Sequence, residues 1–215
     1  SRIRFMARRC SAAWAVVRWG GLFAGGARNR EFSKDLAGPC RSVARSLAAL
    51  REGARVMNIL VLNCGSSTVK FQIIESDLDL IERDSERRLA SGLLERIGSQ
   101  ALITFQAEGR PAVKSTEPLK DHRAAIDKIL RWIVSPEARI ESIRSLSDLD
   151  AVGHRVVHGG EKFQKSVRID KAVLAGIEDC IELAPLHNPA NLKGIKACQD
   201  LLGEGVPQVA VFDTA

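Results

Sequence analysis

Short apolar runs and alternating segments predict β-strands along the chain after Met57. Residues 58–63 are almost continuously apolar and end in a cluster of Gly, Ser and Thr, which is typical of a buried strand that enters a turn. Residues 69–74 alternate between apolar and polar side chains and predict a returning strand. The two segments together predict a hairpin with a hydroxyl-rich tip. Residues 77–100 are charged and predict no defined element, and further strands are predicted at residues 101–105, 151–160 and 208–212.

Helical periodicity separates the later strands. Between Asp121 and Val134, apolar residues recur at helical spacing, with Asp121 as the predicted N-cap and Pro136 as the stop. Two further helices are predicted over residues 170–183 and 189–202, the second with a proline in its first turn. Strands that alternate with helices predict an α/β fold.

Charge is distributed unevenly along the 215 residues. The net charge of +6 suggests a nucleic-acid-binding protein at first. However, residues 1–56 hold 12 basic and three acidic residues, whereas the other 159 residues hold 20 basic and 23 acidic ones. The basic character therefore belongs to the first quarter, and we predict no nucleic-acid partner. The 45% of hydrophobic residues and 27% of charged residues are ordinary for a globular protein, which excludes disorder throughout.

The first 56 residues are predicted to be a basic extension of the folded part. Their longest apolar stretch, residues 12–27, is interrupted by Arg18 and is too short to cross a bilayer, so we predict no membrane partner. Three interpretations are open: a secretory signal, a mitochondrial transit peptide, and an extension that is disordered or not native. We favour the third, because Met57 opens an apolar run typical of a protein start. The folded domain would then span residues 57–215.

The cysteines predict neither a disulfide framework nor a zinc finger. The chain has five of them, an odd number, and no Cys-x-x-Cys or paired Cys/His spacing occurs. This usage predicts a reducing, cytoplasmic location.

Residues 63–70, with the sequence NCGSSTVK, form a candidate phosphate-binding turn. Gly65 would let the backbone approach a ligand, and three hydroxyl groups and Lys70 supply hydrogen-bond donors. The segment is not a Walker A loop, because no GxxxxGK[ST] pattern occurs and a strand is predicted to follow. An ordinary hairpin turn explains the composition equally well.

Residues 153–160, with the sequence GHRVVHGG, contain a candidate carboxylate ligand. On a strand, Arg155 and Val157 would share one face and the two histidines the other. A guanidinium group pairs with both oxygens of a carboxylate, and a neighbouring valine suits a short apolar tail. A structural ion pair is the alternative for the arginine. Zinc binding by the histidines is not predicted, because their spacing suits a helix and the valines and glycines favour a strand.

Two further candidates lie near the ends of predicted elements. His187, in a stiff loop with two prolines, is a candidate general acid or base, with a histidine held by loop hydrogen bonds as the alternative. Asp213 follows a buried strand, where carboxylates in open α/β sheets meet ligands. A cap or turn residue is the alternative for Asp213.

Four motifs, in order and at similar separations, resemble the acetate kinases: NCGSSTVKF at 63–71, GHRVVHGGEKF at 153–163, LAPLHNPANLKGI at 183–195 and VFDTA at 211–215. The resemblance runs from Met57 to Ala215 and corresponds to the N-terminal domain of the family. It implies an actin-like ATPase (ribonuclease H-like) fold, with ATP and Mg²⁺ between two domains. It also implies reversible transfer of the γ-phosphoryl group of ATP to acetate, giving acetyl phosphate and ADP, and a homodimer for the full-length protein.

The resemblance assigns the first motif to the nucleotide. Asn63 would help to hold the magnesium ion, and Lys70 would contact the phosphates of ATP. Ser66 and Thr68 would line the same turn.

The resemblance assigns the later motifs to acetate. Arg155 would bind the carboxylate, and Val157 and Leu186 would form the apolar pocket for the methyl group. Asp213 would be the catalytic acid/base or a positioning carboxylate, and His187 would have a supporting role. Because a carboxylate is already a nucleophile, the reaction requires no strong base.

The resemblance also implies that a second domain is missing after Ala215, so the chain alone is expected to be inactive. One alternative is a kinase of propionate or another short-chain acid, since one pocket methylene changes binding by only about 1–3 kcal/mol. Another is a non-catalytic phosphate-binding module. The segment 153–163 resembles acetate kinases more than butyrate kinases and favours acetate.

Overall fold

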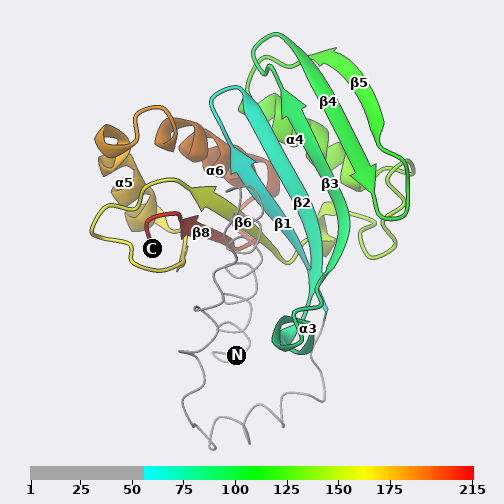
Figure 1. The fold of residues 1–215 in the computed structure, drawn as a ribbon, viewed down its shortest axis with the longest axis horizontal. Helices are drawn as coiled ribbons and strands as arrows, with labels where there is room; N and C mark the ends of the chain where they lie inside the picture. The colour runs from blue at the N-terminus through cyan, green and yellow to red at the C-terminus, as the bar shows by residue number, and fades with distance from the viewer. Residues whose placement is uncertain (1–55) are drawn as a thin grey trace, which may run out of the picture.

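A mixed β-sheet with helices packed on it forms the part of the chain that the structure describes, residues 56–215 of a computed structural model (Figure 1). The interpretations offered for residues 1–55 lie outside the described residues. The sheet has the strand order β5-β4-β3-β2-β1-β6-β8-β7. Its strands are β1 (Met57–Cys64), β2 (Thr68–Ser76), β3 (Arg87–Glu95), β4 (Gln100–Ala107), β5 (Val113–Pro118), β6 (Ala151–Val156), β7 (Val167–Arg168) and β8 (Gln208–Phe212). The α-helices are α3 (Leu78–Glu82), α4 (His122–Ile133), α5 (Lys171–Asp179) and α6 (Asn188–Leu202), with short 3₁₀ turns at Leu146–Asp148 and Ile181–Leu183.

Strands β1 to β5 form an antiparallel meander. The predicted hairpin is confirmed: β1 and β2 pair from Met57 opposite Ser76 to Cys64 opposite Val69. Strand β3 falls where no element was predicted, because a bulge against β2 buries both Leu89 and Ala90 and breaks the alternation. Strand β5 also has no sequence signal, since nearly all its side chains are exposed at the edge of the sheet.

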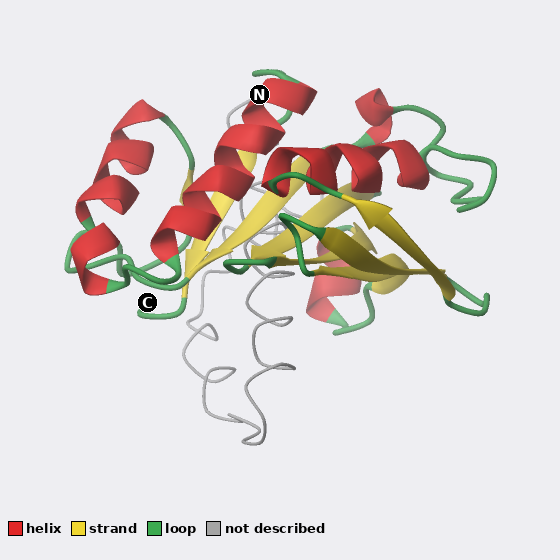
Figure 2. Ribbon diagram, turned by 90° about the horizontal axis from the view of Figure 1, so that it is seen from above, coloured by secondary structure: helices red, strands yellow, loops and turns green. Residues whose placement is uncertain are grey.

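Strands β1, β6 and β8 form the parallel half of the sheet. Ile59 pairs with Ala151, and Val152 pairs with Gln208. Parallel pairing brings the carboxyl ends of all three strands to one edge. Helices α4 and α6 cover the same face of the sheet (Figure 2).

The two faces of β1 pack into different apolar clusters. Leu60 and Leu62 face the helices and belong to the main core. Ile59 and Val61 point to the opposite face, where Val211 of β8 joins them. This alternation decides which residues beyond the strand ends share a face.

The predicted helices form where their signals lie. Asp121 caps α4 through a hydrogen bond from the Ala124 amide (2.8 Å), and Pro189 lies in the first turn of α6. The helix predicted over 170–183 is shorter, because α5 ends at Asp179 and a 3₁₀ turn follows. No helix in the described part of the chain is long and apolar enough to cross a membrane.

The strand predicted over residues 151–160 is wrong beyond Val156. The ladder to β1 ends at His154 and the ladder to β8 ends at Val156. The chain then turns away through Gly160, whose φ of 60° is a conformation that favours glycine. Val157 therefore lies in a loop, and the strand face that it was predicted to share with Arg155 does not extend to it.

His154 is a buried neutral histidine in the centre of β6. It is 2% exposed, and its Nε2 donates to Oε1 of Gln208 at 2.7 Å. Burial lowers the pKa of His154 from 6.5 to about 4, although the hydrogen bond acts in the opposite direction.

We predict that His154 destabilises the fold in mild acid. As the pH falls from 6.5 to about 4, the unfolded chain binds a proton that the folded chain refuses. The loss in free energy of unfolding grows to about 3 kcal/mol at pH 4 and is constant below it. Urea unfolding at several pH values should show that His154→Gln removes this loss. The exposed His187→Gln should keep it, and an identical pH dependence in both variants would contradict the assignment.

Candidate active site

The carboxyl ends of the parallel strands bring three of the predicted site residues to one edge. Asn63 lies near the end of β1, Arg155 near the end of β6, and Asp213 directly after β8. Each is an even number of positions from Ile59, Ala151 or Val211, so all three belong to the sheet face opposite α4 and α6. Lys70 joins them, because it pairs with Asn63 across the hairpin.

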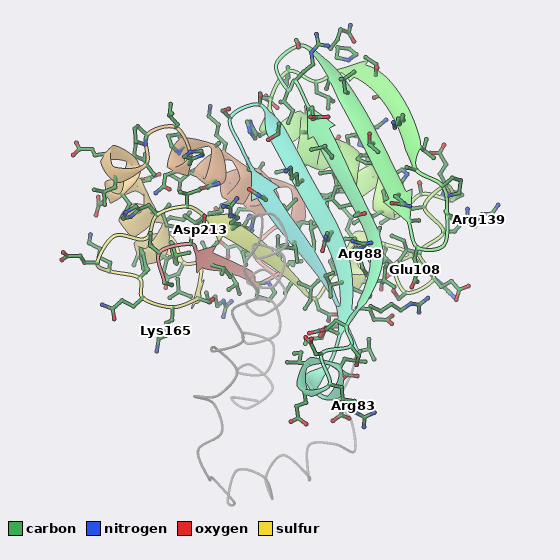
Figure 3. All side chains as sticks on the ribbon, viewed as in Figure 1. Arg83, Arg88, Glu108, Arg139, Lys165 and Asp213 are labelled. Carbon is green, nitrogen blue, oxygen red and sulfur yellow. The ribbon has the colours of Figure 1, made fainter. Side chains whose placement is uncertain are left out.

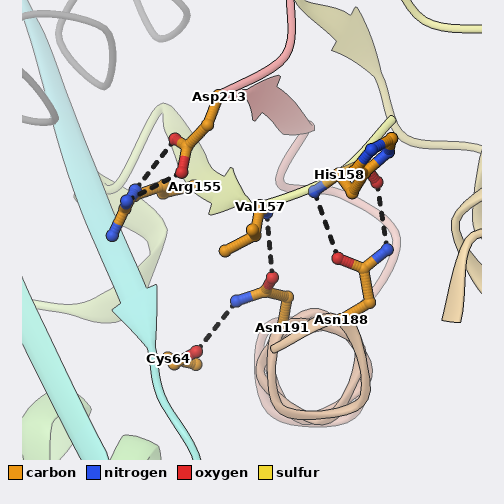
Figure 4. A network of polar contacts seen from close by, with 7 residues as sticks. All are labelled: Cys64, Arg155, Val157, His158, Asn188, Asn191 and Asp213. Atoms are coloured by element: carbon orange, nitrogen blue, oxygen red, sulfur yellow. Dashed lines mark hydrogen bonds and ion pairs between the residues drawn. The ribbon is translucent and has the colours of Figure 1, made fainter. Parts of the chain in front are cut away.

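Arg155 and Asp213 form a two-pronged ion pair (Figure 4). Nε of Arg155 donates to Oδ1 of Asp213 at 2.9 Å, and Nη2 donates to Oδ2 at 2.7 Å. The side chains are 31% and 35% exposed, so a ligand can reach the pair from solvent. The pair uses one edge of the guanidinium and leaves the edge that includes Nη1 without an acceptor among the described residues. That edge can take a second carboxylate.

Asp213 lies apart from most other charged side chains. Figure 3 shows it at the end of β8, whereas Arg88 and Glu108 lie at the far side of the antiparallel strands. The edge where the parallel strands end therefore holds its own charged pair.

The hairpin tip is a closed turn with its hydroxyl groups outside. The Gly65 amide donates to the Thr68 carbonyl at 2.8 Å, so this amide serves the turn and not a ligand. A Cβ at Gly65 would lie 2.7 Å from Thr68 Oγ1, so the turn itself requires the glycine. Ser66 is exposed and Thr68 half-buried, which leaves their hydroxyl groups at the surface of the tip.

His122 is a contact that the sequence did not reveal. It is 6% exposed at the start of α4, and its Nε2 donates to the Gly65 carbonyl at 2.6 Å. The hydrogen bond ties the hairpin tip to a helix on the other side of the sheet. No local pattern connects His122 with Gly65, because 57 positions separate them.

Side-chain acceptors hold the loop that follows β6. Its amides at positions 157 to 160 each donate to a side chain rather than to a neighbouring strand. The acceptors are Asn191 Oδ1 for Val157 (3.1 Å), Asn188 Oδ1 for His158 (3.2 Å), Thr214 Oγ1 for Gly159 (3.1 Å) and His158 Nδ1 for Gly160 (2.9 Å). The two asparagines were missed, although their spacing of three on a predicted helix was a readable signal for one shared face.

The remaining predicted residues lie around this loop. Val157 is half-buried, whereas Leu186 is 76% exposed and does not close an apolar pocket with it. His187 is exposed and stands before α6 without a capping hydrogen bond from its side chain. Across the described residues, no three His, Cys, Asp or Glu side chains gather as a metal site.

Cys64, inside the NCGSSTVK motif, is packed too tightly to act as a nucleophile. It is 4% exposed, and burial raises the pKa of its thiol to about 12. A Cβ at Gly194 would lie 2.4 Å from its sulfur, so α6 requires a glycine to approach β1 this closely. The cysteine therefore belongs to the packing that supports the site.

Comparison with known proteins gives a consistent result over the described part. Residues 58–215 match the family model described as the Acetokinase family. The chain is 59% identical over 159 residues to the acetate kinase of Solibacter usitatus, covering 74% of this chain and 38% of that relative. It is 56% identical over 164 residues to the acetate kinase of Chloroherpeton thalassium, covering 74% and 39%.

Solved structures of similar proteins share the fold. A crystal structure of Porphyromonas gingivalis acetate kinase matches with a TM-score of 0.67 and 42% identity, covering 74% of this chain and 38% of that chain. A propionate kinase from Francisella tularensis matches with a TM-score of 0.62 and 40% identity, covering 74% and 37%. The α/β kinase fold expected from the motifs is thus confirmed. The chain spans about 38% of the length of the relatives it matches.

We predict a measurable coupling between Arg155 and Asp213. In a double-mutant cycle with Arg155→Gln and Asp213→Asn, urea unfolding should give a coupling free energy of about 1 kcal/mol, since the pair is two-pronged and partly shielded. The pair Lys162–Asp179, about 60% exposed on both sides, is the control and should couple more weakly. Additive effects at Arg155 and Asp213 would show that the pair does not persist in solution.

Proposed function

The chain belongs to the acetokinase family, and from this we propose that it forms the N-terminal, acetate-binding domain, residues 57–215, of an enzyme that phosphorylates acetate. The reaction would move the γ-phosphoryl group of ATP to acetate and give ADP and acetyl phosphate, in either direction. The observation that carries this proposal is the Arg155–Asp213 pair beside the Asn63–Lys70 strand ends, in a chain 59% identical to an acetate kinase. A homodimer and a cytoplasmic location remain predictions.

The acceptor half of the site would be built around Arg155. Its Nη1 edge would bind the acetate carboxylate, while Asp213 holds the other edge. Val157 and Leu186 would contact the methyl group. Because Leu186 is 76% exposed, its apolar surface is available to a ligand or to a further part of the protein.

The donor half would be built around the hairpin tip. Lys70 would contact the phosphates of ATP, and the hydroxyl groups of Ser66 and Thr68 line the same turn. The half-buried position of Lys70 on the face that carries Arg155 supports this assignment.

The donor groups at this edge fit a magnesium ion carried by the nucleotide. Mg²⁺ prefers oxygen ligands and is bound through one or two carboxylates plus substrate phosphates rather than by an all-protein cage. The Asn63 carboxamide and the Asp213 carboxylate offer such oxygens at the same edge, and the described residues form no larger cluster. When bound, the ion would offset the negative charge of the phosphates.

Positioning and charge neutralisation would account for catalysis. A carboxylate oxygen of acetate attacks the γ-phosphorus, the bond to the β–γ bridging oxygen breaks, and ADP leaves. Arg155 reduces the repulsion between the two anions and orients the attacking oxygen. Because Asp213 already accepts two hydrogen bonds from Arg155, we assign it to orienting that arginine and not to proton transfer.

Propionate is the second candidate acceptor. The similarity to a propionate kinase structure supports it, as does the lack of contact that would close the pocket around Leu186. A non-catalytic phosphate-binding module is the third candidate. An assay of acetate-dependent and propionate-dependent ADP formation, on a polypeptide of the relatives' full length that contains this chain, distinguishes all three.

We predict that Arg155→Ala in this full-length polypeptide raises the KM for acetate by about tenfold or more and lowers kcat, with the KM for ATP unchanged within about twofold. The loss of the guanidinium removes the ligand of the acetate carboxylate. Arg88→Ala, which removes an exposed arginine on β3, is the control and should change neither constant. An effect of Arg155→Ala on the KM for ATP alone would refute the assignment.

We also predict that Asp213→Asn lowers kcat by about 10–100-fold without raising the KM for acetate, because Arg155 keeps its charge but loses its orientation. Steady-state kinetics at saturating ATP would measure both constants. Near-normal turnover in this variant would show that Asp213 does not orient the arginine.

A further inference from the structure

The ends of β1 and β6 separate at the site, and one side chain bridges them. The ladder between the two strands ends with Leu62 opposite His154, although both strands continue for two residues. There the carboxamide of Asn191 lies between them: Nδ2 donates to the Cys64 carbonyl at 2.8 Å, and Oδ1 accepts from the Val157 amide at 3.1 Å (Figure 4). A carboxamide carries the same donor and acceptor as a peptide group. Asn191 thus replaces the missing rung of the ladder.

The bridge is built into the interior. Asn191 is 3% exposed, so a carboxamide there that lost its partners would pay the cost of burying unpaired polar atoms. Its two partners are 127 and 34 positions away in the sequence, so no local structure holds them together. Within the described loop, Asn191 is the acceptor that links its first amide to β1.

The two strand ends depend on this bridge unequally. The end of β1 is held by its own ladder, with Cys64 opposite Val69 and the Gly65–Thr68 hydrogen bond closing the turn. Val157 has left both ladders of β6, and its amide relies on Asn191. Loss of the bridge would therefore release Val157 and the adjacent end of β6, which carries Arg155, while Lys70 stays in place.

We propose that Asn191 is a positioning residue for the acceptor half of the site, an inference that rests on the proposed function. By fixing Val157 against β1, it sets where the carboxylate and methyl group of the acceptor lie relative to the phosphates. Aspartate at this position keeps the size but has no donor for the Cys64 carbonyl, and leucine leaves both backbone groups unpaired. Neither residue can replace the peptide-like bridge.

The first test measures amide hydrogen exchange by NMR in the full chain. In the unaltered chain, the Val157 amide should exchange as slowly as the ladder amides of β6, a measurement that requires no variant. In Asn191→Asp, exchange at Val157 should be about tenfold faster or more, while the amides of Val152 and His154 keep their rates. Fast exchange of Val157 in the unaltered chain, or unchanged exchange in the variant, would overturn the proposal.

The second test measures kinetics in the full-length polypeptide. Asn191→Asp should raise the KM for acetate by about tenfold and leave the KM for ATP within about twofold, a division that a smaller folded fraction cannot produce. The matched control is Asn58→Asp at the other end of β1. Asn58 is 7% exposed and donates through Nδ2 to the carbonyls of Ser142 and Asp148, so its variant should lose stability and keep both KM values.

The outcomes separate the two proposals. If the unaltered protein shows no acetate-dependent ADP formation, the proposed function fails, and the exchange data still decide whether Asn191 holds Val157. If Val157 is released but the KM for acetate does not change, Asn191 has a structural role only and the positioning proposal fails. An equal rise in the KM for acetate in Asn58→Asp would point to general loosening and would also overturn it.

Discussion

The parallel pairing of β6 with β1 on one side and with β8 on the other is the constraint on which the site depends. It fixes Arg155 and Asp213 on neighbouring strand ends, 58 positions apart in the sequence. Because side chains alternate along a strand, the same pairing puts Asn63, Arg155 and Asp213 on one face. A slip of one residue in either ladder would turn Arg155 or Asp213 away from the other.

The ion pair that results matters more for geometry than for stability. Both side chains are about a third exposed, and solvent reduces the strength of such a pair. Its value lies in direction, since two parallel hydrogen bonds fix the plane of the guanidinium and point its free edge away from Asp213. For an anionic acceptor that approaches an anionic donor, a cation with a fixed orientation is the feature the chemistry requires.

Buried polar side chains from α6 support this edge of the sheet. Asn188 is fully buried and holds both backbone groups of His158, and Asn191 joins β1 to the same loop. Burial of such groups is unfavourable unless their hydrogen bonds are satisfied, and here the partners are backbone groups that the diverging strands leave unpaired. The close contact of Gly194 with Cys64 brings the helix near enough for these bonds to form.

The sequence by itself determined the elements whose signals are local. Periodicity and turn residues predicted the β1–β2 hairpin, and the Asp121 cap and Pro189 marked the starts of α4 and α6. The motifs also predicted Arg155 and Asp213 as site residues, because their chemistry is visible in their types and positions. Tertiary structure alone decided the strand β5, the end of β6 at Val156, the pairing of Arg155 with Asp213, and the bridge made by Asn191. Each of these depends on which distant segments lie side by side, and that information is absent from a local pattern of apolar and polar residues.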